Sequence, residues 1–212
     1  MQRALRDSGA RVVFQVSGDD ETGFAHLAKS PAPRYGRIMV QPITRPAMVA
    51  DIPAITAIYA HAVRHGTATF EINPPSENEM ADRFRALAEA GLPYLVAEHS
   101  GEVQGYAYAS LYRTRFAYRY TLEDSIYVDP DCHGRGIGRA LIDHLLSQAG
   151  ARGFRQMIAV IGDSEQAASI ALHRAAGFTM VGTLAAVGFK FGRWLDTVLM
   201  QRPLGPGATT PP

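Results

Sequence analysis

A glycine-rich loop contains the residues that could most directly bind a ligand. Residues 127–141 read YVDPDCHGRGIGRAL, where an apolar run ends at the turn dipeptide Asp129-Pro130 and a helical pattern follows the glycines. A strand, a glycine loop and a helix in this order point free backbone N–H groups and the positive end of a helix at an anion. The segment therefore predicts a site for a phosphorylated cofactor. A tight turn that binds nothing is the alternative interpretation.

The spacing of the glycines disfavours two common phosphate-binding loops. A dinucleotide fingerprint has the spacing G-x-G-x-x-G after a first strand, with an acidic residue about 20 positions further on. Here Gly134, Gly136 and Gly138 have the spacing G-x-G-x-G, and they lie late in the chain. The G-K-[ST] step of a nucleoside-triphosphate loop is absent. The loop thus indicates a phosphorylated ligand of another kind.

A second candidate segment, residues 112–120, interleaves basic and aromatic side chains as YRTRFAYRY. Guanidinium groups bind carboxylates through paired hydrogen bonds, and aromatic rings form a rigid wall, so the segment could hold a small carboxylate-bearing substrate. Such a pattern can also bind single-stranded nucleic acid, but one short patch in a chain of net charge +1 argues against it. A solvated hairpin with aromatic pairs between its strands remains the stronger alternative.

Composition is typical of a globular protein and excludes several classes. The chain has 212 residues, 47% of them hydrophobic, with 21 basic and 20 acidic side chains. This balance predicts no recruitment of nucleic acid or anionic membrane. No apolar run approaches the ~20 residues that span a bilayer. A single cysteine, Cys132, excludes an intrachain disulfide and is typical of a reducing compartment. We therefore expect a cytoplasmic protein.

The chain divides into one domain with two extensions. Residues 1–38 mix Gly, Ser, Asp and Pro with little periodicity, which predicts a weakly structured N-terminal extension. Residues 39–204 show no linker and no internal repeat, and are expected to form a single domain. The Gly- and Pro-rich residues 205–212 have the composition of a disordered tail.

Strands and helices are expected to alternate within that domain. The predicted strands are Val40–Arg45, Tyr94–Ala97, Val103–Leu111, Leu122–Val128, Met157–Ile161, Met180–Val187 and Asp196–Gln201. The predicted helices begin at Asp51, cover Glu77–Ala90, follow the glycine loop with an apolar stripe from Ile137 to Leu146, and cover Ala167–Ala176. Asp51 is the expected N-cap of the first helix. This order predicts a mixed α/β fold around one sheet.

Several blocks of the sequence resemble the GCN5-related N-acetyltransferase (GNAT) superfamily, and within it the phosphinothricin/methionine sulfone acetyltransferase group. The matching blocks are the glycine loop, Gly66–Phe70, Gly105–Ala109, Thr121–Val128, Ser169–His173 and Gly188–Trp194. The resemblance covers about residues 39–203 and implies the GNAT fold, a central mixed sheet flanked by helices.

The resemblance implies acetyl-CoA as co-substrate, with its pyrophosphate on backbone N–H groups of the loop and its pantetheine arm along the preceding strand. The implied cofactor-binding residues are Ile126, Tyr127, Val128, Gly134, Arg135, Gly136, Ile137, Gly138, Arg139 and Gln166. Two residues depart from the pattern, since His133 replaces the usual Gln or Arg and Gln166 the usual Asn.

The resemblance also implies two catalytic residues. Glu123 in the Thr-x-Glu step matches the family's general base, which takes the proton of the acceptor amine. A strand-edge carboxylate paired with an arginine is the alternative. His173 occupies the position from which a proton donor reaches the leaving thiolate, and an imidazole suits that role near neutral pH. A histidine that only packs against the cofactor arm is its alternative.

The family match assigns substrate contacts to Phe70, Arg113, Arg115, Phe116 and Tyr118. It implies acetylation of the α-amine of a small amino-acid-like molecule such as phosphinothricin, methionine sulfone or methionine sulfoximine, by direct transfer within a homodimer. The alternatives are another acceptor, such as a polyamine or a protein N-terminus, and a non-catalytic acyl-CoA sensor. No metal is expected, because His61 and His65 lack a third ligand.

Overall fold

The computed structural model describes residues 42–212, so the extension expected at residues 1–38 lies outside the described residues. The strands are β1 Ile43–Pro46, β2 Tyr94–His99, β3 Glu102–Leu111, β4 Thr121–Val128, β5 Gln156–Gly162, β6 Thr179–Lys190 and β7 Arg193–Pro203. The helices are α1 Ile52–His65, α2 Glu77–Glu89, α3 Ile137–Ala151 and α4 Ala167–Ala175. The predicted mixed α/β order is confirmed.

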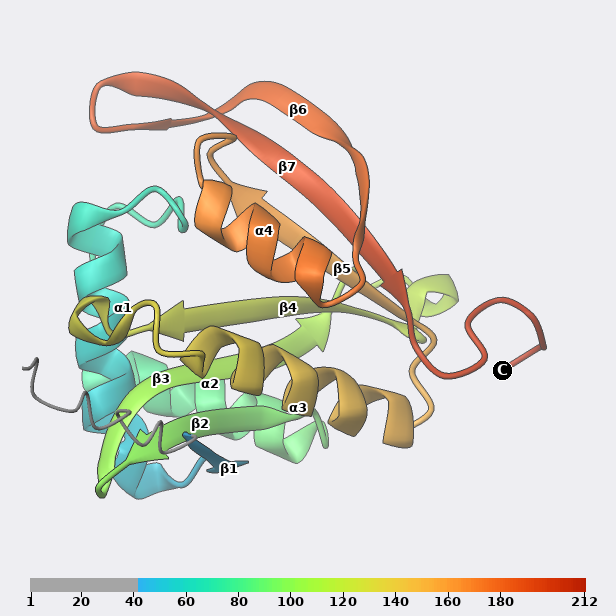
Figure 1. Ribbon diagram of the computed structural model, residues 1–212, viewed down its shortest axis with the longest axis horizontal. Coiled ribbons are helices and arrows are strands. Elements are labelled where there is room, and N and C mark those ends of the chain that lie inside the picture. The colour runs from blue at the N-terminus through green and yellow to red at the C-terminus, as the bar shows by residue number, and fades with distance from the viewer. Residues whose placement is uncertain (1–41) are drawn as a thin grey trace, which may run out of the picture. The chain divides into compact units, whose positions relative to one another are not determined.

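All seven strands join one sheet in the order β1-β2-β3-β4-β5-β7-β6 (Figure 1). Neighbouring strands are antiparallel except β4 and β5, which are parallel. The short strands β1 and β2 lie at one end of this order, and the long β6–β7 hairpin closes the other. The parallel pair of β4 and β5 thus interrupts an otherwise antiparallel sheet.

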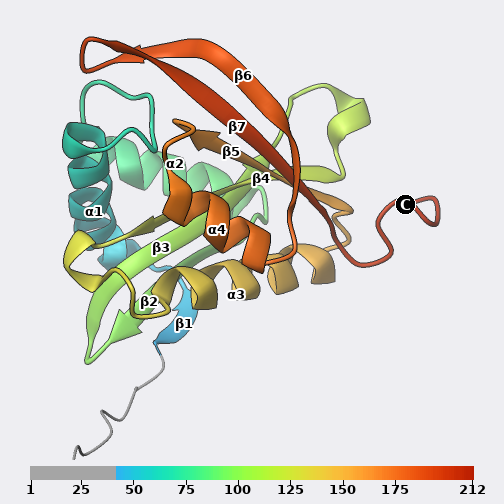
Figure 2. The same cartoon turned by 45° about the horizontal axis from the view of Figure 1, so that its top comes forward.

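Helices cover both faces of the sheet and create two separate cores. Helices α3 and α4 lie on one face and α1 and α2 on the other, as the two views show (Figures 1 and 2). The α3–α4 core contains Leu122, Leu141 and Met157, all fully buried. The α1–α2 core contains Ile55 and is rich in tyrosine. Successive residues of a strand point to opposite faces, so each residue of β4 belongs to one core or the other.

Strands β4 and β5 pair over only part of their length. In the described part of the chain, their register runs from Thr121 opposite Gln156 to Asp124 opposite Ala159 and goes no further. Beyond that point β4 continues to pair with β3, and β5 with β7. The sheet is therefore open between the second halves of its two parallel strands.

The closing hairpin is longer than the sequence pattern predicted. Strands β6 and β7 are joined by the two-residue turn Phe191-Gly192, in which both residues have positive φ (51° and 74°). Such turns are usually signalled by Asn-Gly or Asp-Gly, so Phe-Gly gave no signal. A bulge in β6, where the N–H of Ala186 donates to Asp196 Oδ1 at 2.9 Å, also interrupts the alternation.

Two further expectations concern the ends of the domain. Helix α1 begins at Ile52, next to the predicted start, but Asp51 makes no side-chain cap. Its carboxylate instead accepts hydrogen bonds from Arg45 at 2.7 and 2.8 Å and from the N–H of Met48 at 2.7 Å. Residues 205–212, the segment expected to be a disordered tail, form turns whose Gly207 and Pro211 carbonyls accept hydrogen bonds from Arg155.

Candidate functional site

The glycine loop lies directly before α3 and leaves the start of that helix exposed. Gly134 and Gly136 have positive φ (72° and 81°), a conformation that favours glycine, and Gly136 is the N-cap residue. At Gly138 an added Cβ would lie 3.2 Å from Leu172, so this glycine allows α3 to pack closely against α4. The first N–H groups of a helix have no intrahelical partner, so the loop and helix together can bind an anion.

Side chains around the loop make several contacts with the protein itself. Arg135 donates to the Asp131 carbonyl at 2.8 Å, and His133 Nε2 lies 3.1 Å from the Val128 carbonyl oxygen. Arg139 forms an ion pair with Asp143 at 2.6 Å and also donates to the Ala175 carbonyl. The Ile137 side chain is buried in the core, which leaves only its backbone for a ligand.

The strand before the loop lines the opening in the sheet. Ile126 and Val128 pack against the α3–α4 core, whereas Tyr127 packs against the α1–α2 core. All three lie on β4 beyond its last pairing with β5. The three strand residues and the glycine loop thus form one continuous stretch of chain that begins at the opening.

Glu123 is partly buried on the α1–α2 face of β4, one residue before the opening begins. Burial raises the pKa of its carboxyl group, the charge of Asp124 raises it further, and the charge of Arg113 opposes the rise. A carboxylate whose pKa is raised is a better proton acceptor than an exposed one. The sequence left two interpretations of Glu123, a general base or a strand-edge carboxylate paired with an arginine. Within residues 42–212, Glu123 forms no ion pair, so the structure does not show the second arrangement.

His173 lies on the other face of the sheet and is buried on α4. Its Nε2 is 2.8 Å from Asp124 Oδ2, and its Nδ1 is 2.8 Å from the Ser169 carbonyl oxygen. Burial by itself lowers the pKa of the imidazole, but the hydrogen bond and charge of Asp124 outweigh this effect and raise it. Glu123 and His173 are therefore separated by β4, and His173 contacts the protein through both ring nitrogens.

The basic and aromatic segment forms an exposed loop between β3 and β4. Arg113 packs over the Tyr112 ring, with its guanidinium carbon 4.7 Å from the ring centroid, and its charge acts on Glu123. Arg115 precedes a short 3₁₀ turn, Phe116–Tyr118, in which Phe116 is 77% exposed. Among the four candidate substrate residues in this loop, Arg113 is the one whose charge influences Glu123.

Phe70, the fifth candidate substrate residue, lies in a slot formed by two glycines. A Cβ added at Gly188 would overlap the Phe70 ring, and one added at Gly162 would lie 2.9 Å from it. The surrounding loop is tied to the β6–β7 hairpin by Lys190, whose buried Nζ donates to the carbonyls of Gly66 and Thr69, each at 2.8 Å. Phe70 is thus held in one position by residues far away in sequence.

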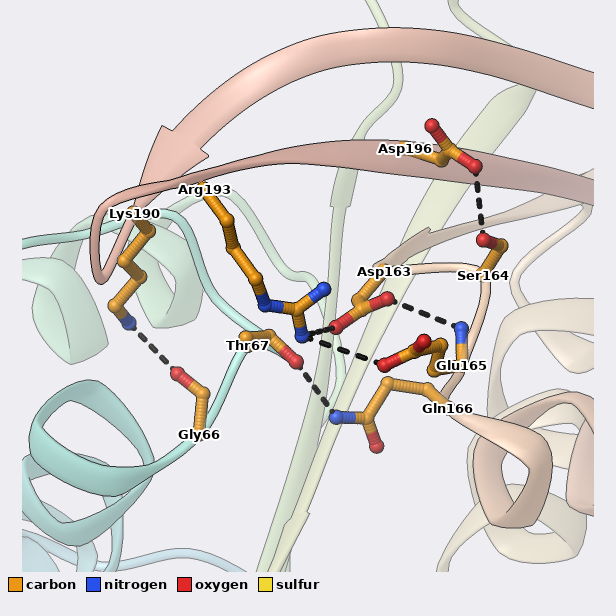
Figure 3. Close-up of polar contacts among 9 residues, drawn as sticks. All are labelled: Gly66, Thr67, Asp163, Ser164, Glu165, Gln166, Lys190, Arg193 and Asp196. Atoms are coloured by element: carbon orange, nitrogen blue, oxygen red, sulfur yellow. Dashed lines mark hydrogen bonds and ion pairs between the residues drawn. The ribbon is translucent and has the colours of Figure 1, made fainter.

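Polar contacts join this loop to the start of α4 as well (Figure 3). Gln166 donates to Thr67 Oγ1 at 2.9 Å, so this candidate cofactor residue contacts the protein in the structure. Arg193 binds Asp163 at 2.7 Å, and Ser164 donates to Asp196 at 2.8 Å. The 66–70 loop, the α4 start and the hairpin tip form one connected polar cluster.

Sequence reasoning missed Asp124 and Lys190. Both are charged residues that are buried in the fold: the side chain of Asp124 and the whole residue Lys190 are each 2% exposed. A charged residue at a core-facing position of a strand is uncommon and must find a partner. That signal was available for Asp124, because Leu122 and Ile126 on either side are apolar.

The fold and the site define an α/β protein with a glycine loop before a helix, a parted pair of parallel strands beside it, and a partly buried carboxylate near the point of parting. Residues 56–178 match the acetyltransferase (GNAT) family. The chain belongs to this family and is an N-acetyltransferase, which confirms the resemblance found in the sequence.

Several characterised relatives are similar over most of the chain. A phosphinothricin N-acetyltransferase from Alcaligenes faecalis is 58% identical over 162 residues, which cover 76% of this chain and 82% of the relative. An L-methionine sulfoximine/L-methionine sulfone acetyltransferase from Pseudomonas paraeruginosa is 44% identical over 168 residues, covering 79% and 97%. The crystal structure of a phosphinothricin acetyltransferase from Sinorhizobium meliloti in complex with acetyl-CoA has a TM-score of 0.79 and 54% identity, covering 81% and 93%.

None of the helices within residues 42–212 is both long and apolar enough to cross a membrane. In the same part of the chain, no group of three or more His, Cys, Asp or Glu side chains is placed to hold a metal ion.

Proposed function

We propose that this enzyme transfers an acetyl group from acetyl-CoA to the α-amine of a small amino-acid-like molecule, of the phosphinothricin, methionine sulfone or methionine sulfoximine type. The names of the relatives support this substrate class. The observation that carries the proposal is Glu123, a partly buried carboxylate beside Arg113 at the point where β4 and β5 part.

The residues present fit acetyl-CoA. It supplies the activated acetyl group as a thioester. Exposed N–H groups of Gly134, Gly136 and the α3 start suit its pyrophosphate, and glycine at these positions lets the backbone approach closely. The unpaired edge of β4 from Ile126 to Val128 suits the pantetheine arm. The other residues of the proposed site are Arg135, Ile137, Gly138, Arg139 and Gln166, of which Arg139 and Gln166 would have to change partners to reach the ligand.

Glu123 acts as the general base in this proposal. An ammonium group has no free lone pair, so the acceptor must lose a proton before it can attack. Burial raises the pKa of Glu123, which makes its carboxylate a better acceptor for that proton. Since no nucleophilic side chain is needed, the transfer is direct, with both substrates bound together. His173 on the opposite face of β4 is the proposed proton donor to the leaving thiolate.

The acceptor contacts are proposed for Phe70, Arg113, Arg115, Phe116 and Tyr118. Arginines can bind a carboxylate or the oxygens of a sulfone, sulfoximine or phosphinate through paired hydrogen bonds. Phe70 provides an apolar wall fixed by Gly162 and Gly188. An acceptor held between them would place its amine toward Glu123.

We further propose that the catalytic domain spans about residues 39–204 and that the enzyme works in the cytoplasm as a homodimer. Exposed apolar side chains on β6 support the dimer: Met180, Val181, Leu184, Val187 and Phe189 are 47–59% exposed.

The test is a thiol-release assay with acetyl-CoA and a panel of acceptors comprising phosphinothricin, methionine sulfone, methionine sulfoximine, a polyamine and a short peptide. We expect turnover with the first three, and intersecting initial-velocity patterns as direct transfer requires. Glu123→Gln should lower kcat by about 10²–10⁴-fold, whereas Glu89→Gln, at an exposed position on α2, should not. Acetyl-CoA binding without turnover of any amine would contradict the proposal. Turnover of only the polyamine or peptide would contradict the substrate class.

A further inference from the structure

The buried pair of His173 and Asp124 connects α4 to β4 at a particular place in the sheet. Asp124 is the last residue of β4 that pairs with β5, opposite Ala159. The two side chains are only 5% and 2% exposed, and they are joined by the contact of 2.8 Å between Nε2 and Oδ2. The pair therefore lies at the point where the two strands part, on the face that carries the glycine loop and α3.

The partners of His173 determine its protons. The Ser169 carbonyl oxygen, 2.8 Å from Nδ1, can only accept a hydrogen bond, so Nδ1 must carry a proton. An ionised Asp124 can likewise only accept, so Nε2 must carry one too. An imidazole with both nitrogens protonated is a cation. With Asp124 ionised, the geometry fits a buried imidazolium–carboxylate pair with one acidic proton between its members.

We propose that Asp124 is a positioning residue that holds His173 as an imidazolium, and that this pair stores the proton needed by the leaving thiolate. The inference rests on the acetyl transfer proposed above. In that reaction Glu123 first takes one proton from the ammonium group of the acceptor and releases it to solvent. The neutral amine nitrogen then bonds to the acetyl carbon, the carbon–sulfur bond breaks, and the second nitrogen proton passes to Glu123. The thiolate takes the stored proton, which leaves a neutral imidazole beside the carboxylate of Asp124.

The arrangement of β4 supports this division of roles. Glu123 and Asp124 are consecutive, so their side chains point to opposite faces of the sheet. Glu123 faces the side of α1 and α2 with Arg113, and Asp124 faces α4. The base and the stored proton are thus kept on opposite sides of the opening and do not neutralise each other directly. Asp124 Oδ1 is also buried and has no hydrogen-bond partner within residues 42–212.

Other charged groups near α4 are engaged elsewhere. Arg139 of α3 binds Asp143 and the Ala175 carbonyl, and Arg202 of β7 donates to the Ala176 carbonyl. Residues 156–162 of β5 contain no ionisable side chain, and the segment after α4 contributes the edge of the Phe178 ring. In the described structure, Asp124 is the ionisable group at hydrogen-bond distance from the imidazole.

Asp124→Asn is the informative variant because it preserves shape. An asparagine can donate its N–H to Nε2 of a neutral imidazole whose Nδ1–H still bonds to Ser169, so the hydrogen bonds survive while the cation is lost. Removing the charge of Asp124 lowers the pKa of His173 and also that of Glu123. Both limbs of the pH profile of kcat should therefore move to lower pH. A purely structural role would reduce kcat at every pH without moving the limbs.

The first measurement is ¹⁵N NMR of the full chain labelled at histidine, with His173→Gln to assign the signal among the seven histidines. We expect both His173 nitrogens to be protonated at neutral pH in the wild type, and a neutral Nδ1–H imidazole in Asp124→Asn. A neutral His173 in the wild type would overturn the proposal even if Asp124→Asn failed to fold. This readout does not depend on which amine the enzyme acetylates.

The second measurement is the pH dependence of kcat with the acceptor found above. Asp124→Asn should lose about tenfold or more of its kcat on the alkaline side. Ser169→Ala is the matched control, because it removes a hydroxyl 3.4 Å from Nδ1 and keeps the carbonyl acceptor. It should leave both limbs in place. Unchanged limbs in Asp124→Asn, or an equal displacement in Ser169→Ala, would overturn the role of Asp124 in the reaction.

Discussion

Two adjacent carboxylates of β4 have opposite environments. The Asp124 side chain is buried, with the His173 imidazole at 2.8 Å, whereas Glu123 is partly buried and its pKa responds to the charges of Asp124 and Arg113. A buried carboxylate without a close cation prefers its neutral form, and one with such a partner prefers its ionised form. One residue step along β4 therefore separates the proposed general base from the proposed partner of the His173 imidazolium.

A substitution of Arg113 tests whether its charge lowers the pKa of Glu123. The charge of Arg113 lowers the pKa of Glu123, whereas burial raises it. Removing that charge in Arg113→Met should therefore raise the pKa of Glu123 further. Because the base is active when ionised, the acidic limb of the kcat profile should move to higher pH. Arg119→Met is the control: this arginine, on the same loop, stacks on Phe116 and Tyr120. An equal displacement in the control, or none in Arg113→Met, would contradict the assignment.

At the scale of the elements, the β6–β7 hairpin positions the 66–70 loop, a part of the candidate site that lies outside the hairpin. Lys190 binds the carbonyls of Gly66 and Thr69, and Gly188 leaves space for the Phe70 ring. An ammonium group is costly to bury, and burial lowers the pKa of Lys190. The carbonyl oxygens compensate for part of this cost. The hairpin therefore acts as a support for the 66–70 loop.

Gly188→Ala tests that support. The added methyl group would overlap the Phe70 ring, so the ring must move, at a cost of about 1–3 kcal/mol of folding stability. We expect a higher KM for the acceptor and an unchanged KM for acetyl-CoA. Gly182→Ala, on the same strand, is the control, since its Cβ would meet no atom of the described residues within 4 Å. If Gly188→Ala raised both KM values equally, the effect would not be specific to the acceptor, which would contradict the role of Phe70 as an acceptor contact.

Local patterns predicted the elements but not the contacts between them. The apolar stripe of α3, the glycine loop and the alternation of β4 are encoded within a few residues, so the sequence was sufficient for them. The His173–Asp124 pair joins residues 49 apart, and Lys190 reaches Gly66 across 124 residues. Such contacts depend on strand order and register, which periodicity does not specify. The parting of β4 from β5 is likewise a property of the sheet that no local pattern in either strand specifies.

Over the whole molecule, the two edges of the sheet differ in protection. Edge strands usually carry charged residues or are short, because an exposed edge can pair with another chain. Strand β1 has four residues and includes Arg45. Strand β6 has twelve residues, and its one charged side chain, Lys190, is buried. The unprotected edge is thus the long one, and its apolar side chains are available to a second copy of the chain.

Leu184→Glu tests whether β6 forms the proposed homodimer interface. Leu184 is 49% exposed at this edge, and a stable interface of standard size buries about 1,600 Å² in total. A carboxylate buried there without a cation would disfavour association. Light scattering after size-exclusion chromatography should give a dimer mass for the wild type and a monomer mass for the variant. Ile43→Glu, at a 64% exposed apolar position on the opposite edge strand, should remain dimeric. A monomeric wild type would contradict the dimer, and loss of the dimer in Ile43→Glu alone would place the interface at β1.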